Sequence, residues 1–212
     1  PVVDGGNLRR VIERSCARHL EQMLPPIVPK RVLIGTAVAR YDLARGFIDA
    51  GYEYIFGDLG FGLGIPIPVR SLRTLHLLAR VLMPIMGRLP FKWLYPTGED
   101  QETTTPKFSD WFDWATVIAD DFHYIRKNLP DRLDGKIIVT NTTTQDDVDL
   151  LRQRGLRYLV TTTPRLEGRS FGTNVIEAAL VAIAVKGRAL TPTEIAAMLH
   201  PDDLAPAVLE LN

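Results

Sequence analysis

The residues of this 212-residue chain best suited to chemistry follow two short apolar runs near its beginning. Gly35, Thr36 and Ala37 directly follow the first run, and Asp58 comes just after the second. In dinucleotide sites, small residues after a strand let a pyrophosphate approach the next helix, and an acid roughly 20 residues later binds a ribose. The spacing therefore predicts a nucleotide cofactor held by Gly35, Thr36, Ala37 and Asp58.

The glycine pattern of such sites is incomplete in this chain. The three positions of G-x-G-x-x-G read Gly35, Ala37 and Arg40, so only the first glycine is present. A strand–helix–strand unit without any cofactor would show the same apolar pattern, and this alternative stays open. If a cofactor binds, residues 36–39 should present free backbone amides to it. We expect NAD or NADP, with NAD favoured because an acid at position 58 disfavours a 2′-phosphate.

Polar runs follow two further buried segments later in the chain. Thr140, Asn141 and Thr142 follow one of them, and Thr161 and Thr162 follow the other. Hydroxyl groups and backbone amides at such positions suit a phosphate, a ribose or an amide, so we expect these residues to contact the cofactor. Helix capping would explain a single threonine equally well.

Four residues are candidates for catalysis. His123 lies close in sequence to Asp120, and a histidine beside a carboxylate can transfer protons near neutral pH. Lys92 and Tyr95 lie in a long aromatic segment, 89–113, that is typical of a lid or binding loop. A purely structural histidine is the alternative. C-x-x-C, H-E-x-x-H and G-x-S-x-G are absent, so the sequence predicts neither a zinc site nor a hydrolase serine.

The elements that must position these residues alternate between strands and helices. This alternation predicts a three-layer α/β/α Rossmann-like domain with a mostly parallel sheet over residues 30–212. The strand that begins near Thr116 is expected beside the first strand, so that the crevice lies between Gly35 and Asp120. Residues 1–29 are expected to be a helix and linker, left from an upstream domain or connecting to one, because the chain opens at Pro1. The expected helices span residues 7–24, 38–50, 69–87, 148–155 and 173–185, with a last one from 191, and the expected strands span 32–34, 54–56, 115–119, 136–139 and 157–160.

Composition excludes several classes of partner. The net charge is zero, so no basic field favours nucleic acid. No apolar run reaches the roughly 18 residues of a spanning helix, and a membrane partner is not expected. The apolar helix at 69–87 is expected to pack in the core or in a homodimer interface. Cys16 is the only cysteine, which favours the reducing cytoplasm.

Five stretches of the sequence resemble a known bacterial family. They read GDLGFGLGIPIPVRSLR, RLPFKWLYPTG, ADDFHYIRK, VTNTTT and TTTPRLEGRSFGTNVIEA, and they extend from about residue 58 to residue 178. Members of the family that they resemble are labelled quinate 5-dehydrogenase. The resemblance implies an NAD(P)-dependent oxidoreductase similar in plan to shikimate dehydrogenases, with another domain before the Rossmann domain. The catalytic lysine and aspartate of those enzymes lie in that other domain, so no residue of this chain inherits their roles.

The leading hypothesis for function is therefore NAD(P)-linked oxidoreduction of a small hydroxylated substrate, with this chain as the cofactor-binding domain. Two alternatives remain open at this point. One is a non-catalytic nucleotide-binding or regulatory domain. The other is methyl transfer from S-adenosylmethionine, because those enzymes also use a glycine turn and an acid after the second strand.

Overall fold

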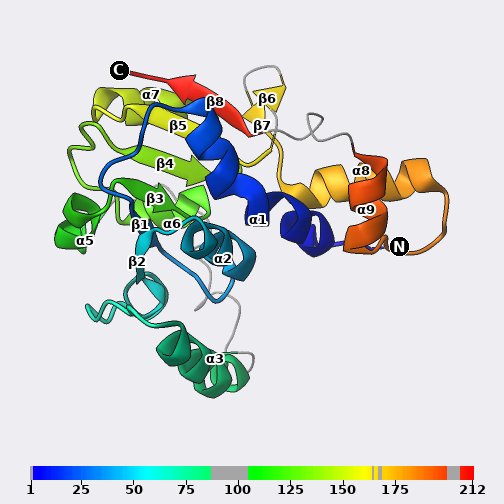
Figure 1. Cartoon of the computed structure of the whole chain (residues 1–212), viewed down its shortest axis with the longest axis horizontal. Helices are drawn as coiled ribbons and strands as arrows, with labels where there is room; N and C mark the ends of the chain where they lie inside the picture. The colour runs from blue at the N-terminus through cyan, green and yellow to red at the C-terminus, as the bar shows by residue number, and fades with distance from the viewer. Residues whose placement is uncertain (1, 87–104, 164, 167–168, 200–205) are drawn as a thin grey trace.

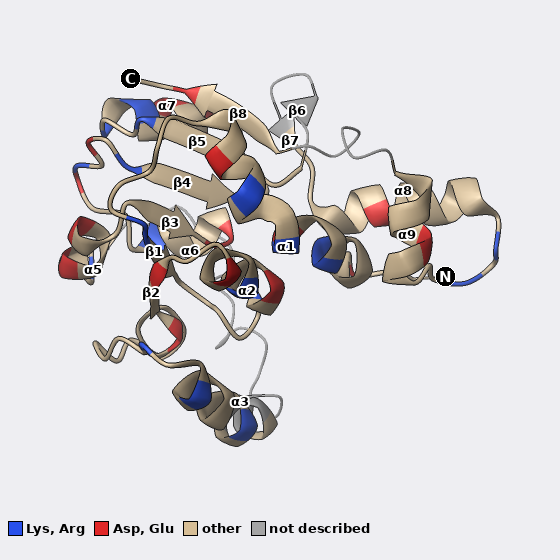
Figure 2. Ribbon diagram, viewed as in Figure 1, with Lys and Arg blue, Asp and Glu red and all other residues tan. Residues whose placement is uncertain are grey.

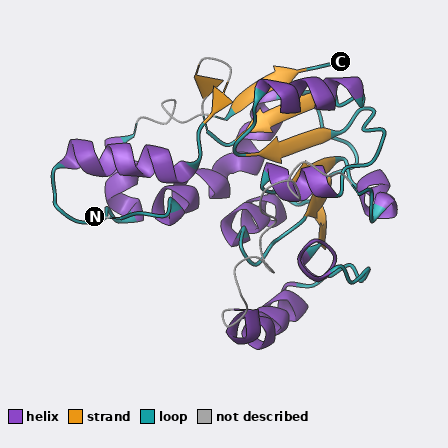
Figure 3. Cartoon of the chain, turned by 180° about the vertical axis from the view of Figure 1, so that it is seen from behind, coloured by secondary structure: helices purple, strands orange, loops and turns teal. Residues whose placement is uncertain are grey.

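The computed structural model describes residues 2–86, 105–163, 165–166, 169–199 and 206–212, and it is an α/β fold built on a six-stranded sheet. Helices cover both faces of this sheet (Figures 1 and 3), giving the three layers predicted from the sequence. The elements in chain order are α1 (Gly6–Met23), β1 (Arg31–Ile34), α2 (Tyr41–Asp49), β2 (Glu53–Phe56), the π-helix η1 (Asp58–Gly62), α3 (Leu72–Met86), α5 (Ser109–Trp114), β3 (Val117–Ala119), α6 (Phe122–Lys127), β4 (Ile137–Thr140), α7 (Gln145–Gln153), β5 (Tyr158–Thr161), β6 (Arg165–Leu166), β7 (Arg169–Ser170), α8 (Thr173–Ala184), α9 (Pro192–Met198) and β8 (Ala207–Glu210).

The sheet has the order β2-β1-β3-β4-β5-β8, and every neighbouring pair is parallel except β5 with β8. β1 pairs with β3 in the register Val32 to Val117, which confirms the predicted position of that strand. The chain runs from β1 to one side and later returns on the other, so the switch in strand order lies between β1 and β3. In open α/β sheets, the crevice beyond the carboxyl ends of the strands at such a switch is the usual ligand site.

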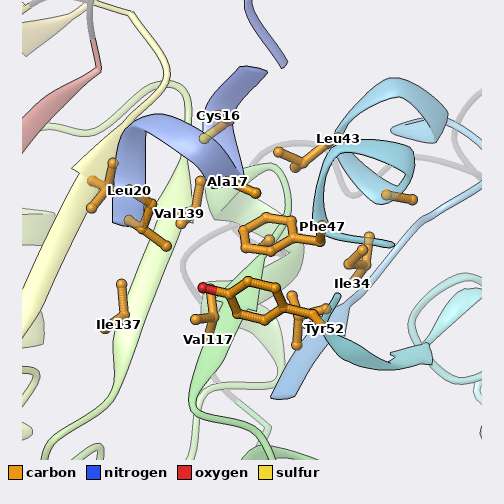
Figure 4. Packing of buried hydrophobic residues seen from close by; sticks show 14 of the residues in the cluster. Cys16, Ala17, Leu20, Ile34, Leu43, Phe47, Tyr52, Val117, Ile137 and Val139 are labelled. Carbon is orange, nitrogen blue, oxygen red and sulfur yellow. The ribbon is translucent and has the colours of Figure 1, made fainter. Parts of the chain in front are cut away.

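Successive side chains along each strand point to opposite faces of the sheet, so the core is divided between the two faces. On one face, Cys16 and Leu20 of α1 and Phe47 of α2 pack with strand residues such as Val117 and Val139 (Figure 4). On the other face, the strand residues Leu33, Ile55, Ile118, Ile138 and Leu159 pack against α5, α6 and α7. Side chains point alternately to opposite faces of a strand, so both faces of a sheet covered by helices must carry apolar residues.

Helix α1 belongs to the same folded unit as the sheet. It crosses α2 so closely that a Cβ on Gly46 would lie 2.7 Å from the backbone oxygen of Arg14. Its first half joins a smaller core, in which Leu8 and Ile12 pack against residues of α8 and α9. The prediction that residues 1–29 connect to an upstream domain stays a prediction.

Several element boundaries differ from those expected. Residues 35–40 form turns, and α2 begins at Tyr41 and not near residue 38. β8 was not anticipated, because its pairing with β5 joins segments about 50 residues apart. In α3, Leu75 is buried whereas Leu77 and Val81 are exposed, so only one side of this helix packs in the core. No helix among the described residues is long and apolar enough to cross a membrane.

Candidate functional site

A pocket of about 330 Å³ lies at the carboxyl ends of β3 and β4. We call it the His123 pocket. Its walls come from the loop after β3, from α6, from the loop after β4 and from the start of α7. The lining residues are Asp121, Phe122, His123, Arg126, Asn141, Thr142, Thr144 and Asp147. Three residues predicted for the site, His123, Asn141 and Thr142, therefore meet here.

The start of α7 fixes one wall of the His123 pocket. Thr144 caps this helix: its hydroxyl accepts a hydrogen bond from the Asp147 amide, and the Asp147 carboxylate accepts one from the Thr144 amide. The other carboxylate oxygen of Asp147 accepts a hydrogen bond from Nη1 of Arg126 at 2.9 Å. A capping box therefore also orients the guanidinium group that lines the pocket.

Asp121 forms the inner wall of the pocket, and its position is held by two donors. Its Oδ1 atom accepts hydrogen bonds from the Arg40 guanidinium and from the Asn141 side-chain amide. Its side chain is 20% exposed. These contacts fix a carboxylate at the edge of the pocket next to His123.

Burial lowers the pKa of His123 below its usual value, and this effect is larger than the opposing one of the Asp121 carboxylate. Arg40 acts in the same direction as burial. The imidazole is therefore neutral at pH 7, which is the form that can accept a proton. Thus the pocket combines a neutral base with a guanidinium group and amide and hydroxyl groups.

The predicted crevice between β1 and β3 is filled by the protein's own groups. The Thr36 hydroxyl donates to Oδ1 of Asp120 at 2.8 Å, and Asp120 is only 1% exposed. A Cβ on Gly35 would lie 2.2 Å from the second oxygen of Asp120 and 2.4 Å from the ring of Phe61. The glycine is thus required by packing within the chain. Burial, followed by the Asp121 charge, raises the pKa of Asp120.

Arg40 and Glu13 complete the closure of this crevice. Both side chains are almost fully buried and form an ion pair, and Arg40 also binds Asp121. Desolvation raises the pKa of Glu13 to about 6, although Arg40 lowers it. This ion pair was not predicted, although the sequence holds two signals for it. Arg40 occupies the third glycine position of the fingerprint, and Glu13 lies at helical spacing with the apolar Cys16 and Leu20.

Asp58 binds the backbone of the turn after β1. Its carboxylate accepts hydrogen bonds from the amides of Ala37 at 3.1 Å and Val38 at 2.8 Å. The amide of Ala39 donates to the Thr36 carbonyl oxygen. The prediction of free amides at residues 36–39 is therefore wrong, because a carboxylate about 20 residues later satisfies two of them. Burial raises the pKa of Asp58 to about 6 against the opposing effect of the two amides.

The remaining predicted residues divide into buried threonines and residues outside the described ranges. Thr140, Thr161 and Thr162 are at most 2% exposed, and the Thr161 hydroxyl donates to the carbonyl of Thr163. In their observed positions they support the ends of β4 and β5 and do not line the His123 pocket. Lys92 and Tyr95 lie outside the described residues. Among the described residues, no group of three or more His, Cys, Asp or Glu side chains is arranged to hold a metal ion.

Comparison with known proteins places the chain in a family. Residues 7–211 match the family described as Domain of unknown function (DUF8754), and the chain belongs to this family. The match includes α1 as well as the sheet. Neither the curated proteins nor the solved structures contained a match to this chain.

A dinucleotide does not fit the β1–β3 crevice in this arrangement. A pyrophosphate needs backbone amides and space at the first turn. The amides of Ala37 and Val38 already donate to Asp58, and Asp120, Phe61 and Arg40 fill the adjoining volume. The geometry favours the His123 pocket as the place for a small ligand.

Proposed function

We propose that this chain binds a small hydroxylated organic acid in the His123 pocket, and that His123 accepts a proton from a substrate hydroxyl group. The observation that carries this proposal is the convergence of His123, Arg126 and Asn141 from α6 and the loop after β4 around one cavity of about 330 Å³. Small-molecule sites usually begin at about 300 Å³ and place a few polar groups at fixed positions.

Each lining group has a chemical task in this proposal. Arg126 offers a guanidinium group, which binds carboxylates well because several N–H donors lie in one plane. Asn141 and Thr142 can donate to and accept from hydroxyl groups. Neutral His123 is the proton acceptor, and Asp121, held by Arg40 and Asn141, stabilises the imidazolium ion that forms.

The test uses quinate and shikimate as probes, with binding measured by calorimetry. We expect Arg126→Gln to weaken binding about 10- to 100-fold, since a hydrogen bond to a charged group contributes about 1.5–3 kcal/mol. His76→Ala is the matched control, because His76 lies on α3, where it contacts Tyr41 outside the pocket. Equal binding by the native chain and Arg126→Gln would reject the assignment of the pocket.

The pH dependence provides an independent test of His123. The pKa of His123 is lowered, so its neutral form persists throughout the neutral range and is lost only as the pH falls through a value below 6.5. We therefore expect proton acceptance to fail on the acidic side only. A titration of the His123 ring by NMR that placed its pKa above 7 would contradict the role as a base.

We also propose NAD or NADP, with NAD favoured, as the redox partner in a dehydrogenase reaction, as the family resemblance implies. Bound to this chain, the cofactor would take the hydride from the carbon of the alcohol while His123 takes the hydroxyl proton. The strand order and the place of Asp58 after β2 support this second proposal. Binding requires the Asp58 carboxylate to leave the amides of Ala37 and Val38. Thermal-shift assays with NAD, NADP and S-adenosylmethionine test it, since a ligand that binds only the native state raises stability. A shift with none of the three would exclude a cofactor role for this chain.

A further inference from the structure

A second pocket, of about 270 Å³, lies at the end of α6, between the glycine-rich turn after β2 and the segment before α5. We call it the lysine pocket. Its lining residues are Gly60, Phe61, Gly62, Leu63, Gly64, Thr105, Lys107, Lys127 and Asn128. It shares no residue with the His123 pocket, although both pockets take residues from α6 or its end.

The two walls of the lysine pocket are fixed by separate contacts. The Phe61 ring stacks on Phe108 and Phe112, with ring centroids 6.0 Å apart in each pair, and this holds the glycine-rich turn. The Thr105 amide donates to the Lys127 carbonyl oxygen at 2.9 Å, which brings the segment with Lys107 next to the end of α6. The cavity is therefore built by packing and a backbone hydrogen bond.

Among the described residues that line this cavity, the charges have one sign. Lys107 and Lys127 are both there, and none of the described lining residues is acidic. Within the described part of the chain, neither lysine forms an ion pair. Over the rest of the described chain, Figure 2 shows both acidic and basic residues, although α3 carries only basic ones. Two uncompensated ammonium groups at one concavity attract an anion.

Gly62 gives the second argument, because nothing else in the described structure requires a glycine there. Gly60 must lack a side chain, since its Cβ would lie 2.6 Å from the Trp111 ring, and Gly64 has a φ of +73°. Gly62 is not in the left-handed region, and its Cβ would meet no described atom within 4 Å. A glycine that packing and backbone geometry both leave unexplained exposes backbone to a ligand. It also lies in a π-helical turn, a feature often found at functional sites.

We propose that the lysine pocket binds a phosphate group of a small molecule, with Lys107 and Lys127 as the cationic contacts and the backbone around Gly62 as the surface that the phosphate approaches. Ammonium groups bind phosphate as point charges, and a glycine turn lets its oxygens come close to backbone. This site does not depend on the proposed function of the His123 pocket.

The experiment titrates inorganic phosphate and pyrophosphate into the full chain by calorimetry at low ionic strength. We expect saturable binding that Lys107→Gln and Lys127→Gln each weaken about 10- to 100-fold, as for loss of a charged hydrogen bond. Lys186→Gln is the matched control, because Lys186 lies in the loop between α8 and α9 and pairs with Glu194 of α9. No saturable binding by the native chain, or equal weakening by Lys186→Gln, would overturn the proposal.

Two further variants separate this site from its alternatives. Gly62→Ala should melt at the native temperature, since the added methyl group enters open space, yet bind pyrophosphate more weakly. Binding by Gly62→Ala equal to that of the native chain would overturn the role of the backbone. His123→Ala should bind pyrophosphate as the native chain does, so failure of the His123 proposal and failure of this one give different results.

Discussion

Removal of the Arg40 side chain should lower the stability of this fold strongly. Its side chain is 2% exposed and pairs with Glu13, which is 0% exposed, and with Asp121. In Arg40→Met the volume is roughly kept, but the carboxylates lose their cation. Removing one partner of a buried ion pair costs about 3–5 kcal/mol. That is a large fraction of the roughly 5–15 kcal/mol by which domains are stable.

The loss of stability in Arg40→Met should depend on pH. The pKa of Glu13 is about 6 with Arg40 present and rises further without it. At pH 5 the Glu13 carboxyl in Arg40→Met is therefore protonated and neutral, whereas at pH 8 more of the cost of a buried charge is felt. We expect the destabilisation by Arg40→Met to be larger at pH 8 than at pH 5.

Urea unfolding followed by circular dichroism at both pH values measures this effect. The double variant Glu13→Leu with Arg40→Met should be more stable than Arg40→Met alone, because it removes the uncompensated charge. Arg132→Met is the control: its side chain is 83% exposed, so its loss should leave the free energy of unfolding almost unchanged. A loss below about 1 kcal/mol in Arg40→Met, or strictly additive effects in the double variant, would refute the reasoning.

Three further predictions concern Asp58, Glu13 and a helix crossing. Asp58→Ala should lower the free energy of unfolding by about 1–3 kcal/mol, because two backbone amides lose their acceptor. The control Asp131→Ala, at an exposed position, should leave it unchanged. Equal effects of the two variants in urea unfolding would contradict this prediction. Burial raises the pKa of Asp58 and Glu13 in the folded state to about 6, from 3.8 and 4.5. Their contribution to the free energy of unfolding is therefore fully present below the unfolded pKa values and is lost as the pH rises through about 6. Native stability that rises over this range, or a pH dependence of stability that is unchanged in Asp58→Asn, would count against this prediction. Gly46→Ala should destabilise the fold by about 1–3 kcal/mol, because the added methyl group clashes with the backbone of α1. Gly62→Ala should not destabilise it. Equal melting temperatures of the two variants would reject the close crossing of α1 and α2.

Local patterns in the sequence were sufficient to predict the layers and the centre of the sheet. Apolar runs bounded by polar residues placed β1, β3, β4 and β5. The helix expected from residue 191 is α9, where Thr191 and Glu194 form a capping box. Both signals lie within a few residues of the feature that they predict. β8 was missed because antiparallel pairing at the sheet edge depends on a partner far away in the sequence.

The candidate site could be predicted only in part, for a related reason. His123, Asn141 and Thr142 lie within four residues of the ends of β3 and β4, so their meeting at one edge of the sheet follows from parallel topology. Asp58 has the spacing of a ribose-binding acid, but its partners are decided by how the turn after β1 folds back on it. Arg40 is buried against Glu13 of α1. The sequence marks both residues as unusual, but their contact depends on how α1 packs on α2.

The most direct test of the central claim is where small hydroxylated acids bind in the crystal. Crystals of the native chain would be soaked with quinate and shikimate at high concentration, and the same soak would be repeated with Arg126→Gln. We predict density for the acid in the His123 pocket, with its carboxylate at Arg126, and clearly lower occupancy in the variant. Density in the β1–β3 crevice beside Gly35, or none in the His123 pocket of the native chain, would contradict the account.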